Sequence, residues 1–221
     1  MKKLESTLLN MALSLTGFTV VAGALLGFVN DVTTQPIADA NAKILSDAIK
    51  VVVPAFDNNP AESKETIEVD GVNYTVYKAT NADKFVGAAV ESATMGFGGE
   101  LKILVGFDVE GNIVNYSLLS HAETPGLGSK SAEWFKKGAK GDITGKNPGE
   151  KPLVVSKDGG EINAITASTI TSRAFLKAVN NAYNAYAKQY SGAKGSIHGT
   201  SGATQQANAE TAETEKTNEN K

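Results

Sequence analysis

Residues 163–173 read NAITASTITSR, a run of small and hydroxyl side chains that leads directly into a long amphipathic helix. From this point the apolar residues recur at three- and four-residue spacing, which is the period of an α-helix: Phe175, Leu176, Val179, Ala182, Tyr183 and Tyr186. Thr169, Thr171 or Ser172 can cap that helix, because a hydroxyl oxygen at a helix start accepts a hydrogen bond from a free backbone N–H. The sequence therefore predicts that the helix begins within this stretch.

A helix start of this kind can also bind an anion. The first-turn N–H groups and the helix dipole favour negative charge, and Arg173, the only arginine of the chain, lies in the same turn. A phosphate on or near Thr169 would meet backbone donors, hydroxyls and one guanidinium. The other interpretation is an ordinary helix cap without a ligand.

Composition excludes several classes of function. The chain has 221 residues, a formal net charge of -3 and no nucleic-acid-binding motif, so we expect no nucleic-acid partner. There are no cysteines, which excludes disulfides, clusters held by thiolates and cysteine nucleophiles. The two histidines, His121 and His198, are too far apart in sequence to form a zinc-ligand motif. Any redox chemistry must therefore use an organic cofactor.

The first 29 residues are typical of a membrane anchor. Residues 8–29 carry no charge, and at 1.5 Å per residue they span about 33 Å, enough to cross the apolar core of a bilayer. Lys2 and Lys3 precede the run, whereas Asp31 is the first charge after it. This asymmetry predicts that residues 1–7 are cytoplasmic and that the chain after the span lies on the opposite, exported side of the membrane.

A cleaved signal peptide is the competing interpretation of this segment. Small-residue sites such as Ala38-Asp39-Ala40 resemble signal cleavage sites. They lie about ten residues beyond the apolar run, past Pro36, and the run is longer than a usual signal core. We therefore predict an uncleaved, single-pass anchor.

The remainder predicts an α+β domain, a mainly antiparallel sheet packed with helices. A helix is expected over residues 36–53, ended by Pro54. Asp70-Gly71 is typical of a tight hairpin turn between two strands. The other expected elements are strands at 85–90, 101–107, 113–119 and 153–156 and a helix at 131–140. Residues 30–190 then form the exported domain, and the polar residues 191–221 are expected to be a disordered tail.

Residues 120–130, SHAETPGLGSK, form a second candidate site. Pro125 and two glycines impose a compact loop with exposed backbone N–H groups. Two interpretations stay open, a structured turn and a loop that closes over an aromatic ring or a phosphate, since glycines allow a close approach of the backbone.

Several motifs together resemble the FMN-binding domain family: the anchor, the Gly96-Phe97-Gly98-Gly99 turn before the strand LKILVGFD, the HAETPGLG loop and the TASTITS segment. The resemblance runs from the anchor to about Tyr190. Members of that family include the G subunit of the Rnf ion-translocating electron-transport complex and the C subunit of the sodium-translocating NADH:quinone oxidoreductase. In the family, a flavin transferase (ApbE type) attaches FMN through a phosphodiester to the last threonine of a Ser/Thr-Gly-Ala-Thr motif, which an aspartate precedes by six residues.

The resemblance implies that Thr169 is the covalent FMN acceptor and Thr166 the first residue of the motif. This chain departs from the motif at three positions, where it has Asn163, Ala167 and Ser168. Ser168 and Thr171 are lesser candidates for the acceptor, and Thr204, in the tail sequence SGAT, lacks a helix to follow it. The residues expected to bind the cofactor are Thr166, Ser168, Thr169, Thr171, Ser172 and Arg173 together with His121, Glu123, Thr124, Pro125, Gly126, Leu127 and Gly128.

The expected function is that of an electron-transfer subunit rather than a stand-alone enzyme. The resemblance implies a flavoprotein of the bacterial inner membrane, with its domain on the periplasmic side. It would relay electrons through covalent FMN in an Rnf-type ferredoxin:NAD complex, with other membrane subunits as partners. The alternatives are the equivalent C subunit of the sodium-translocating quinone oxidoreductase, and an anchored binding or scaffold domain without a cofactor.

Overall fold

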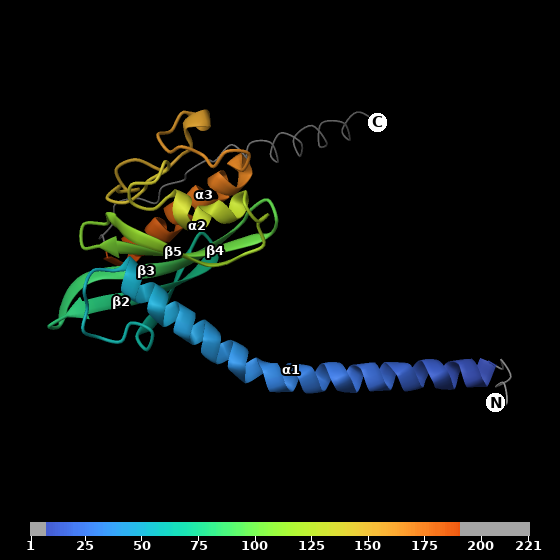
Figure 1. The fold of residues 1–221 in the computed structure, drawn as a ribbon. Helices are drawn as coiled ribbons and strands as arrows, with labels where there is room; N and C mark the ends of the chain where they lie inside the picture. Colours follow the sequence, from blue (N-terminus) through green and yellow to red (C-terminus); the bar gives the residue numbers. More distant parts are fainter. Residues whose placement is uncertain (1–7, 191–221) are drawn as a thin grey trace, which may run out of the picture. The chain divides into compact units, whose positions relative to one another are not determined.

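The computed structural model describes residues 8–190. The expected cytoplasmic residues 1–7, the expected disordered tail at 191–221 and Thr204 lie outside these described residues. The elements, shown in Figure 1, are α1 (Leu8–Val52), β1 (Lys64–Val69), β2 (Val72–Asn81), β3 (Lys84–Met95), β4 (Glu100–Asp108), β5 (Ile113–His121), η1 (Gly128–Lys130), α2 (Ser131–Trp134), η2 (Ser156–Asp158) and α3 (Thr169–Tyr190).

Helix α1 joins two segments that the sequence predicted separately, the apolar run 8–29 and the helix 36–53. Pro36 lies inside the helix, although a proline removes one backbone hydrogen bond at an interior position. The chain divides into two compact units, and the boundary falls within α1, after Ile44. Residues 8–44 therefore belong to one unit, and the described chain from Leu45 onward forms the other.

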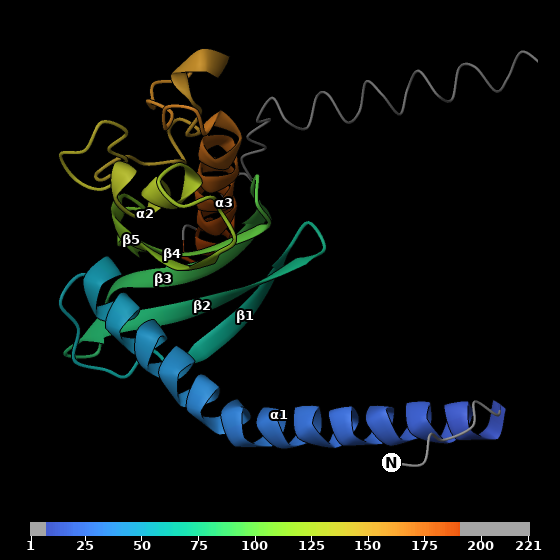
Figure 2. The same cartoon turned by 45° about the vertical axis from the view of Figure 1, so that its right-hand side comes forward.

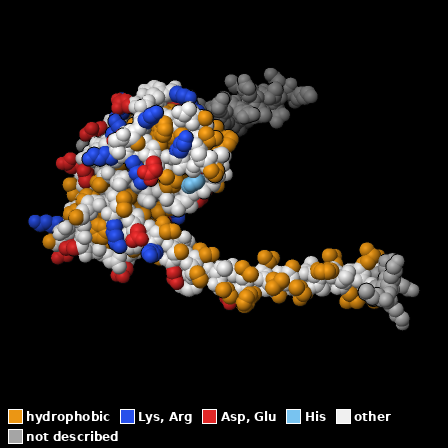
Figure 3. Space-filling view, viewed as in Figure 1, with side chains coloured by type: hydrophobic (Ala, Val, Ile, Leu, Met, Phe, Trp, Pro, Cys, Tyr) orange, Lys and Arg blue, Asp and Glu red, His pale blue; other side chains and the backbone are white. Residues whose placement is uncertain are grey.

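Among the described residues, α1 is the one helix that is long and apolar enough to cross a membrane. Its large apolar side chains from Leu8 to Val32 are all more than half exposed. Figure 3 shows hydrophobic side chains along this helix. Exposed apolar surface of this extent is unfavourable in water, and burial in lipid removes that cost.

The five strands form one sheet in which each strand pairs antiparallel with the next along the chain. The predicted hairpin at Asp70-Gly71 is confirmed, and both turn residues have the positive φ that a tight turn requires, 52° and 76°. The turn between β2 and β3 uses Ala82 and Asp83, with φ of 49° and 62°, and no glycine marks it in the sequence. Asp57 stabilises this turn, since its carboxylate accepts from the Ala82 N–H at 2.7 Å.

Helix α3 lies across one face of the sheet (Figure 2). The predicted alternation of β4 is confirmed: every second side chain points into this core and has no exposed surface, namely Leu101, Ile103, Val105 and Phe107. On the helix, Phe175 and Val179 are equally buried. This packing holds the start of α3 next to the β3–β4 turn, where the Thr94 hydroxyl donates to the Ala174 carbonyl at 2.9 Å.

The opposite face of the sheet is covered by the end of α1. Ile49 and Val52 pack there against a smaller cluster that includes Tyr77 and Leu104. Asn115 adds a hydrogen bond from its side-chain amide to the Val51 carbonyl at 3.3 Å. The sheet is therefore the middle of three layers.

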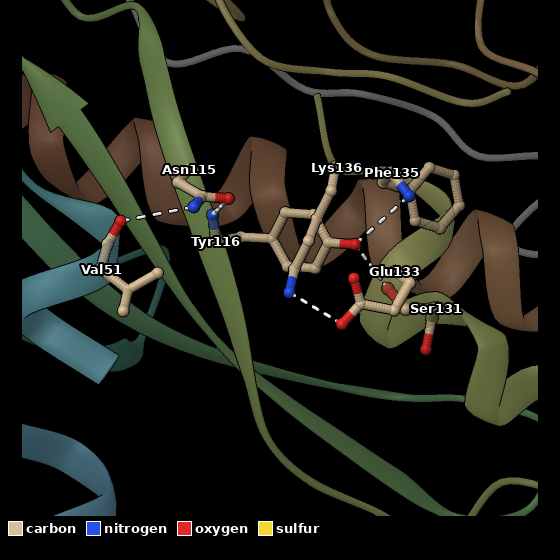
Figure 4. A network of polar contacts seen from close by, with 7 residues as sticks. All are labelled: Val51, Asn115, Tyr116, Ser131, Glu133, Phe135 and Lys136. Atoms are coloured by element: carbon tan, nitrogen blue, oxygen red, sulfur yellow. Dashed lines mark hydrogen bonds and ion pairs between the residues drawn. The ribbon is translucent and has the colours of Figure 1, made fainter. Parts of the chain in front are cut away.

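Two expected elements are shorter than predicted. The helix expected at 131–140 is limited to Ser131–Trp134, and the chain then turns through Gly138 at a φ of 78°. Its position depends on Tyr116, whose buried hydroxyl donates to the Ser131 carbonyl at 2.7 Å and accepts from the Phe135 N–H at 3.2 Å (Figure 4). The strand expected at 153–156 is a single parallel bridge between Val155 and Ile162.

Candidate functional site

A cavity of about 410 Å³ opens at the N-terminal end of α3. Three segments line it: the β3–β4 turn through Phe97, the 120s loop through Glu123, Thr124, Leu127 and Gly128, and the helix start through residues 167–171. The two segments that the sequence predicts as binding sites, the 120s loop and the start of α3, therefore meet at one place. The volume lies within the range of small-molecule and cofactor sites.

Glu123 connects the three segments. Its side chain is almost completely buried, with 5% exposed, and one carboxylate oxygen accepts from the Phe97 N–H at 2.8 Å and the Gly98 N–H at 3.4 Å. The other oxygen accepts from the Thr171 hydroxyl at 2.8 Å. A buried carboxylate is costly unless donors surround it, and these three donors supply that compensation.

The glycines near Glu123 are explained by this arrangement. A β-carbon at Gly96 would overlap one Glu123 carboxylate oxygen, and a β-carbon at Gly128 would overlap the other. Both positions therefore require glycine so that the backbone can approach the carboxylate. The glycine-rich β3–β4 turn and the PGLG sequence are thus two walls of one buried polar site.

The start of α3 is shaped by a turn at residues 165–168. The Ser168 N–H donates to the Ile165 carbonyl at 3.0 Å, and Ala167 adopts the left-handed conformation, with a φ of 59°. Ser172 closes the turn: its hydroxyl accepts from the Ile165 N–H and donates to the Ser168 carbonyl, both at 2.9 Å. Ser172 has no exposed surface, and both hydrogen bonds of its hydroxyl are made within the protein.

Thr169 is the first residue of α3 and lies in the cavity wall. Its hydroxyl is 3.3 Å from the Lys157 ammonium group, which η2 carries. Arg173, one turn further, forms a two-pronged ion pair with Asp158, at 2.7 Å and 2.6 Å. The bonds from Arg173 hold the pKa of the Asp158 carboxyl below its usual range, and they raise the pKa of the guanidinium.

Asn163 supports the loop that precedes this turn. Its side-chain amide donates to the Lys140 carbonyl at 2.9 Å, and its own carbonyl accepts from the Trp134 indole N–H at 2.8 Å. The first of these bonds requires a donor, which an ionised aspartate at this position could not supply.

A model of the FMN-binding domain family matches residues 96–184, a range that contains all three segments of the cavity wall. Curated relatives are similar over most of the chain. The G subunit of the ion-translocating oxidoreductase complex from Yersinia pestis is 32% identical over 187 residues, covering 80% of this chain and 88% of the relative. The same subunit from Cereibacter sphaeroides is 31% identical over 170 residues, covering 74% and 77%.

The chain belongs to this G-subunit family. A solved structure of the C subunit of the Na(+)-translocating NADH-quinone reductase from Parabacteroides distasonis is 20% identical, with a TM-score of 0.42. That match covers 68% of this chain and 90% of the solved one.

In this member of the G-subunit family, seven of the expected cofactor-binding residues line the cavity: Glu123, Thr124, Leu127, Gly128, Ser168, Thr169 and Thr171. The other six are arranged around it. His121 is exposed, and its ring nitrogen Nδ1 accepts from the Glu123 N–H at 3.1 Å. Pro125, Gly126 and Thr166 are exposed loop residues, while Ser172 and Arg173 make the internal contacts described above.

Four residues at the site were not predicted as binding residues: Phe97, Lys157, Ala167 and Ile170. The glycines on both sides of Phe97 are a signal that could have identified it, since they indicate a backbone forced close to another group. Ile170 interrupts the run of hydroxyl residues as an apolar side chain that is 48% exposed. Lys157 lies in a polar loop twelve residues before Thr169, and nothing in the local sequence pairs the two.

Proposed function

We propose that this protein is a membrane-anchored flavoprotein subunit that relays electrons through FMN attached covalently to Thr169, within an Rnf-type ion-translocating complex. The observation that carries the proposal is the position of the Thr169 hydroxyl. Thr169 is the first residue of a long helix and lies in the wall of a cavity of about 410 Å³. It also lies inside the region that matches the FMN-binding domain family. Bound FMN would supply one- and two-electron transfer, which the side chains of this chain cannot provide.

The residues of the cavity suit the two chemically different parts of FMN. The first-turn N–H groups of α3 have no acceptor within the helix, and together with the helix dipole they favour a phosphate at Thr169. Phe97, Leu127 and Ile170 leave 69%, 40% and 48% of their surfaces exposed, and all three line the cavity. An isoalloxazine ring placed against them would cover this apolar surface.

Thr171 is expected to act as an acceptor rather than a donor toward the cofactor. A threonine hydroxyl has one proton, and here that proton is directed to Glu123 at 2.8 Å. Only the lone pairs of the Thr171 oxygen remain for a ligand. Glu123 therefore orients Thr171 and holds the Phe97 backbone in place, so it is a positioning residue.

The membrane part of the proposal rests on residues 8–29. We assign this segment as the single span, with residues 1–7 in the cytoplasm and residues 30–190 as the exported domain, because lysines precede the span and Asp31 follows it. The glycines in the span would allow other membrane subunits to approach closely. A flavin transferase on the exported side would load the cofactor.

The experiment uses the full-length protein produced together with a flavin transferase. Intact mass and peptide mapping should find FMN, bound as a phosphodiester, on the peptide that contains Thr169. The denatured protein should fluoresce in a gel under ultraviolet light, since only covalent flavin survives denaturation. Thr169→Ala should lose all bound flavin and stay folded.

Thr204→Ala is the matched control, because Thr204 ends the sequence SGAT in the tail. This variant should carry as much flavin as the wild type. An unmodified wild-type mass, or full retention of flavin in Thr169→Ala, would refute the assignment and would favour the scaffold interpretation.

A further inference from the structure

Two cationic side chains lie near Thr169, Arg173 and Lys157, and they differ in how free they are to pair with an added phosphate. Arg173 lies in the first turn of α3, but its guanidinium is bound by both oxygens of Asp158. This ion pair is largely removed from solvent, with 26% and 19% of the two side chains exposed. The charge of Arg173 is therefore compensated within the protein before any phosphate arrives.

Lys157 has a different environment. Its ammonium group donates to the Thr169 hydroxyl at 3.3 Å, and no ion pair within contact distance is found for it among the described residues. The carboxylate that its charge does influence, Asp158, is already bound through both oxygens by Arg173. Asp158, the backbone neighbour of Lys157, is thereby fixed to α3. The ion pair thus holds η2 against the helix, and η2 in turn presents Lys157 to the hydroxyl.

We propose that Lys157 is the cation that binds the phosphate carried by Thr169, and that the Arg173–Asp158 pair serves to position it. The inference rests on the proposed attachment of FMN at Thr169. Its basis is the contact between the Lys157 ammonium and the acceptor oxygen itself, together with the internal neutralisation of Arg173.

The transfer reaction defines what Lys157 contributes. The Thr169 oxygen forms a bond to the FMN phosphorus of FAD, the bond from that phosphorus to the bridging pyrophosphate oxygen breaks, and AMP leaves. The threonine proton passes to a base of the transferase. Negative charge increases on the phosphoryl oxygens during this step, and an ammonium group next to the acceptor oxygen stabilises it. In the product, the same ammonium pairs with the anionic phosphodiester.

The test compares the full-length wild type with Lys157→Gln, Lys157→Arg and the control Lys50→Gln. Lys50 is an exposed lysine at the end of α1, on the opposite face of the sheet, so the control makes the same change of charge away from the site. Each protein is incubated with purified flavin transferase and FAD, and flavin incorporation is followed by in-gel fluorescence. The flavin-loaded proteins are then compared by phosphorus NMR.

We expect Lys157→Gln to incorporate flavin at least about tenfold more slowly, which is the effect of losing one charge-assisted hydrogen bond in a transition state. The phosphodiester resonance should also shift in this variant. Lys157→Arg should restore most of the rate, and Lys50→Gln should match the wild type in both measurements.

The outcomes separate this inference from the function on which it rests. A wild type that takes up no flavin overturns both. A wild type that is loaded, with Lys157→Gln loaded at the same rate, overturns only the role of Lys157. A slow Lys157→Gln with an unchanged phosphorus resonance, or a Lys50→Gln that is equally slow, also overturns it, because either result places the effect in transferase recognition or in overall charge.

Discussion

The two ends of helix α3 contact the rest of the domain in different ways. At the C-terminal end, the Tyr186 hydroxyl donates to the Asp108 carbonyl at 2.7 Å, and the Tyr190 ring stacks on Phe85 with centroids 4.5 Å apart. At the N-terminal end, Thr169 and the half-exposed Ile170 face a cavity. One end of the helix is used to stabilise the fold, and the other leaves polar and apolar groups accessible to a ligand.

This difference indicates how the domain can keep a cavity open at one end of α3 while the other end stabilises the fold. The C-terminal end contributes packed aromatic rings, and burial raises the pKa of the Tyr190 hydroxyl to about 12. The N-terminal end depends instead on a buried carboxylate and a serine that satisfy the backbone around the cavity. Changes at the first end should therefore affect stability, and changes at the second should mainly affect flavin attachment.

The largest expected loss of stability comes from a residue beside the N-terminal end of α3, Glu123, and is an exception to this division between the two ends. Glu123→Ala leaves the Phe97 N–H and the Thr171 hydroxyl without their acceptor, so we expect a loss of about 3 kcal/mol of unfolding free energy. Flavin attachment should fall as well. Denaturant unfolding of the full-length protein in detergent measures the first effect. Glu133→Ala is the control, because the Glu133 side chain is 75% exposed, and this variant should be unchanged within about 0.5 kcal/mol.

The second prediction tests the C-terminal end alone. Tyr186→Phe removes the hydrogen bond to Asp108 and should cost about 1.5 kcal/mol, with flavin attachment unaffected. Tyr190→Phe is a matched control, since the buried Tyr190 hydroxyl has no hydrogen-bond partner among the described residues. This control should be neutral or slightly stabilising in thermal unfolding. Slower flavin attachment in Tyr186→Phe would show that the two ends of the helix are coupled.

The third prediction concerns pH. Because Arg173 lowers the pKa of Asp158 in the folded state, the ion pair stabilises the protein above the unfolded pKa of an aspartate, about 3.9, and this contribution is lost as the pH falls through the lower folded value. At neutral pH Arg173→Gln should cost about 1 kcal/mol, and the difference from the wild type should shrink as the solution is acidified below about pH 4.

Unfolding curves of both proteins between neutral and acidic pH provide the measurement. Lys136→Gln breaks the more exposed ion pair to Glu133 and should show almost no difference at any pH. A constant gap between Arg173→Gln and the wild type down to low pH would mean that Arg173 stabilises the helix start by packing and not by its charge.

The smallest expected effect is a gain in unfolding free energy. Ala167 holds a left-handed conformation at the N-terminal end of α3, a conformation that costs a residue with a β-carbon about 1 kcal/mol relative to glycine. Ala167→Gly should therefore raise the unfolding free energy by about 0.5 kcal/mol, after the greater freedom of glycine in the unfolded chain is subtracted. A loss of stability in thermal unfolding would contradict this explanation of the turn.

Much of the site could be predicted because its residues are concentrated in two short motifs. The hydroxyl run before α3 and the HAETPGLG loop were both identified as candidate binding segments, and seven of their residues line the cavity. The prediction did not distinguish residues that face the cavity from those that support it. Ser172 and Thr171 are adjacent hydroxyl residues in one helical turn, yet one closes the turn and the other lies in the cavity wall.

The sequence by itself determined the local elements: the apolar span, the hairpin at Asp70-Gly71, the alternating strand β4 and the amphipathic helix α3. Each depends on residues within a few positions of one another, so periodicity and turn chemistry are enough to identify it. Only the tertiary structure decided that Glu123 would meet Phe97 and Thr171 and that Lys157 would reach Thr169. Those contacts join residues that are 12, 26 and 48 positions apart in the chain, beyond the reach of local periodicity, and they form only when the fold brings the segments together.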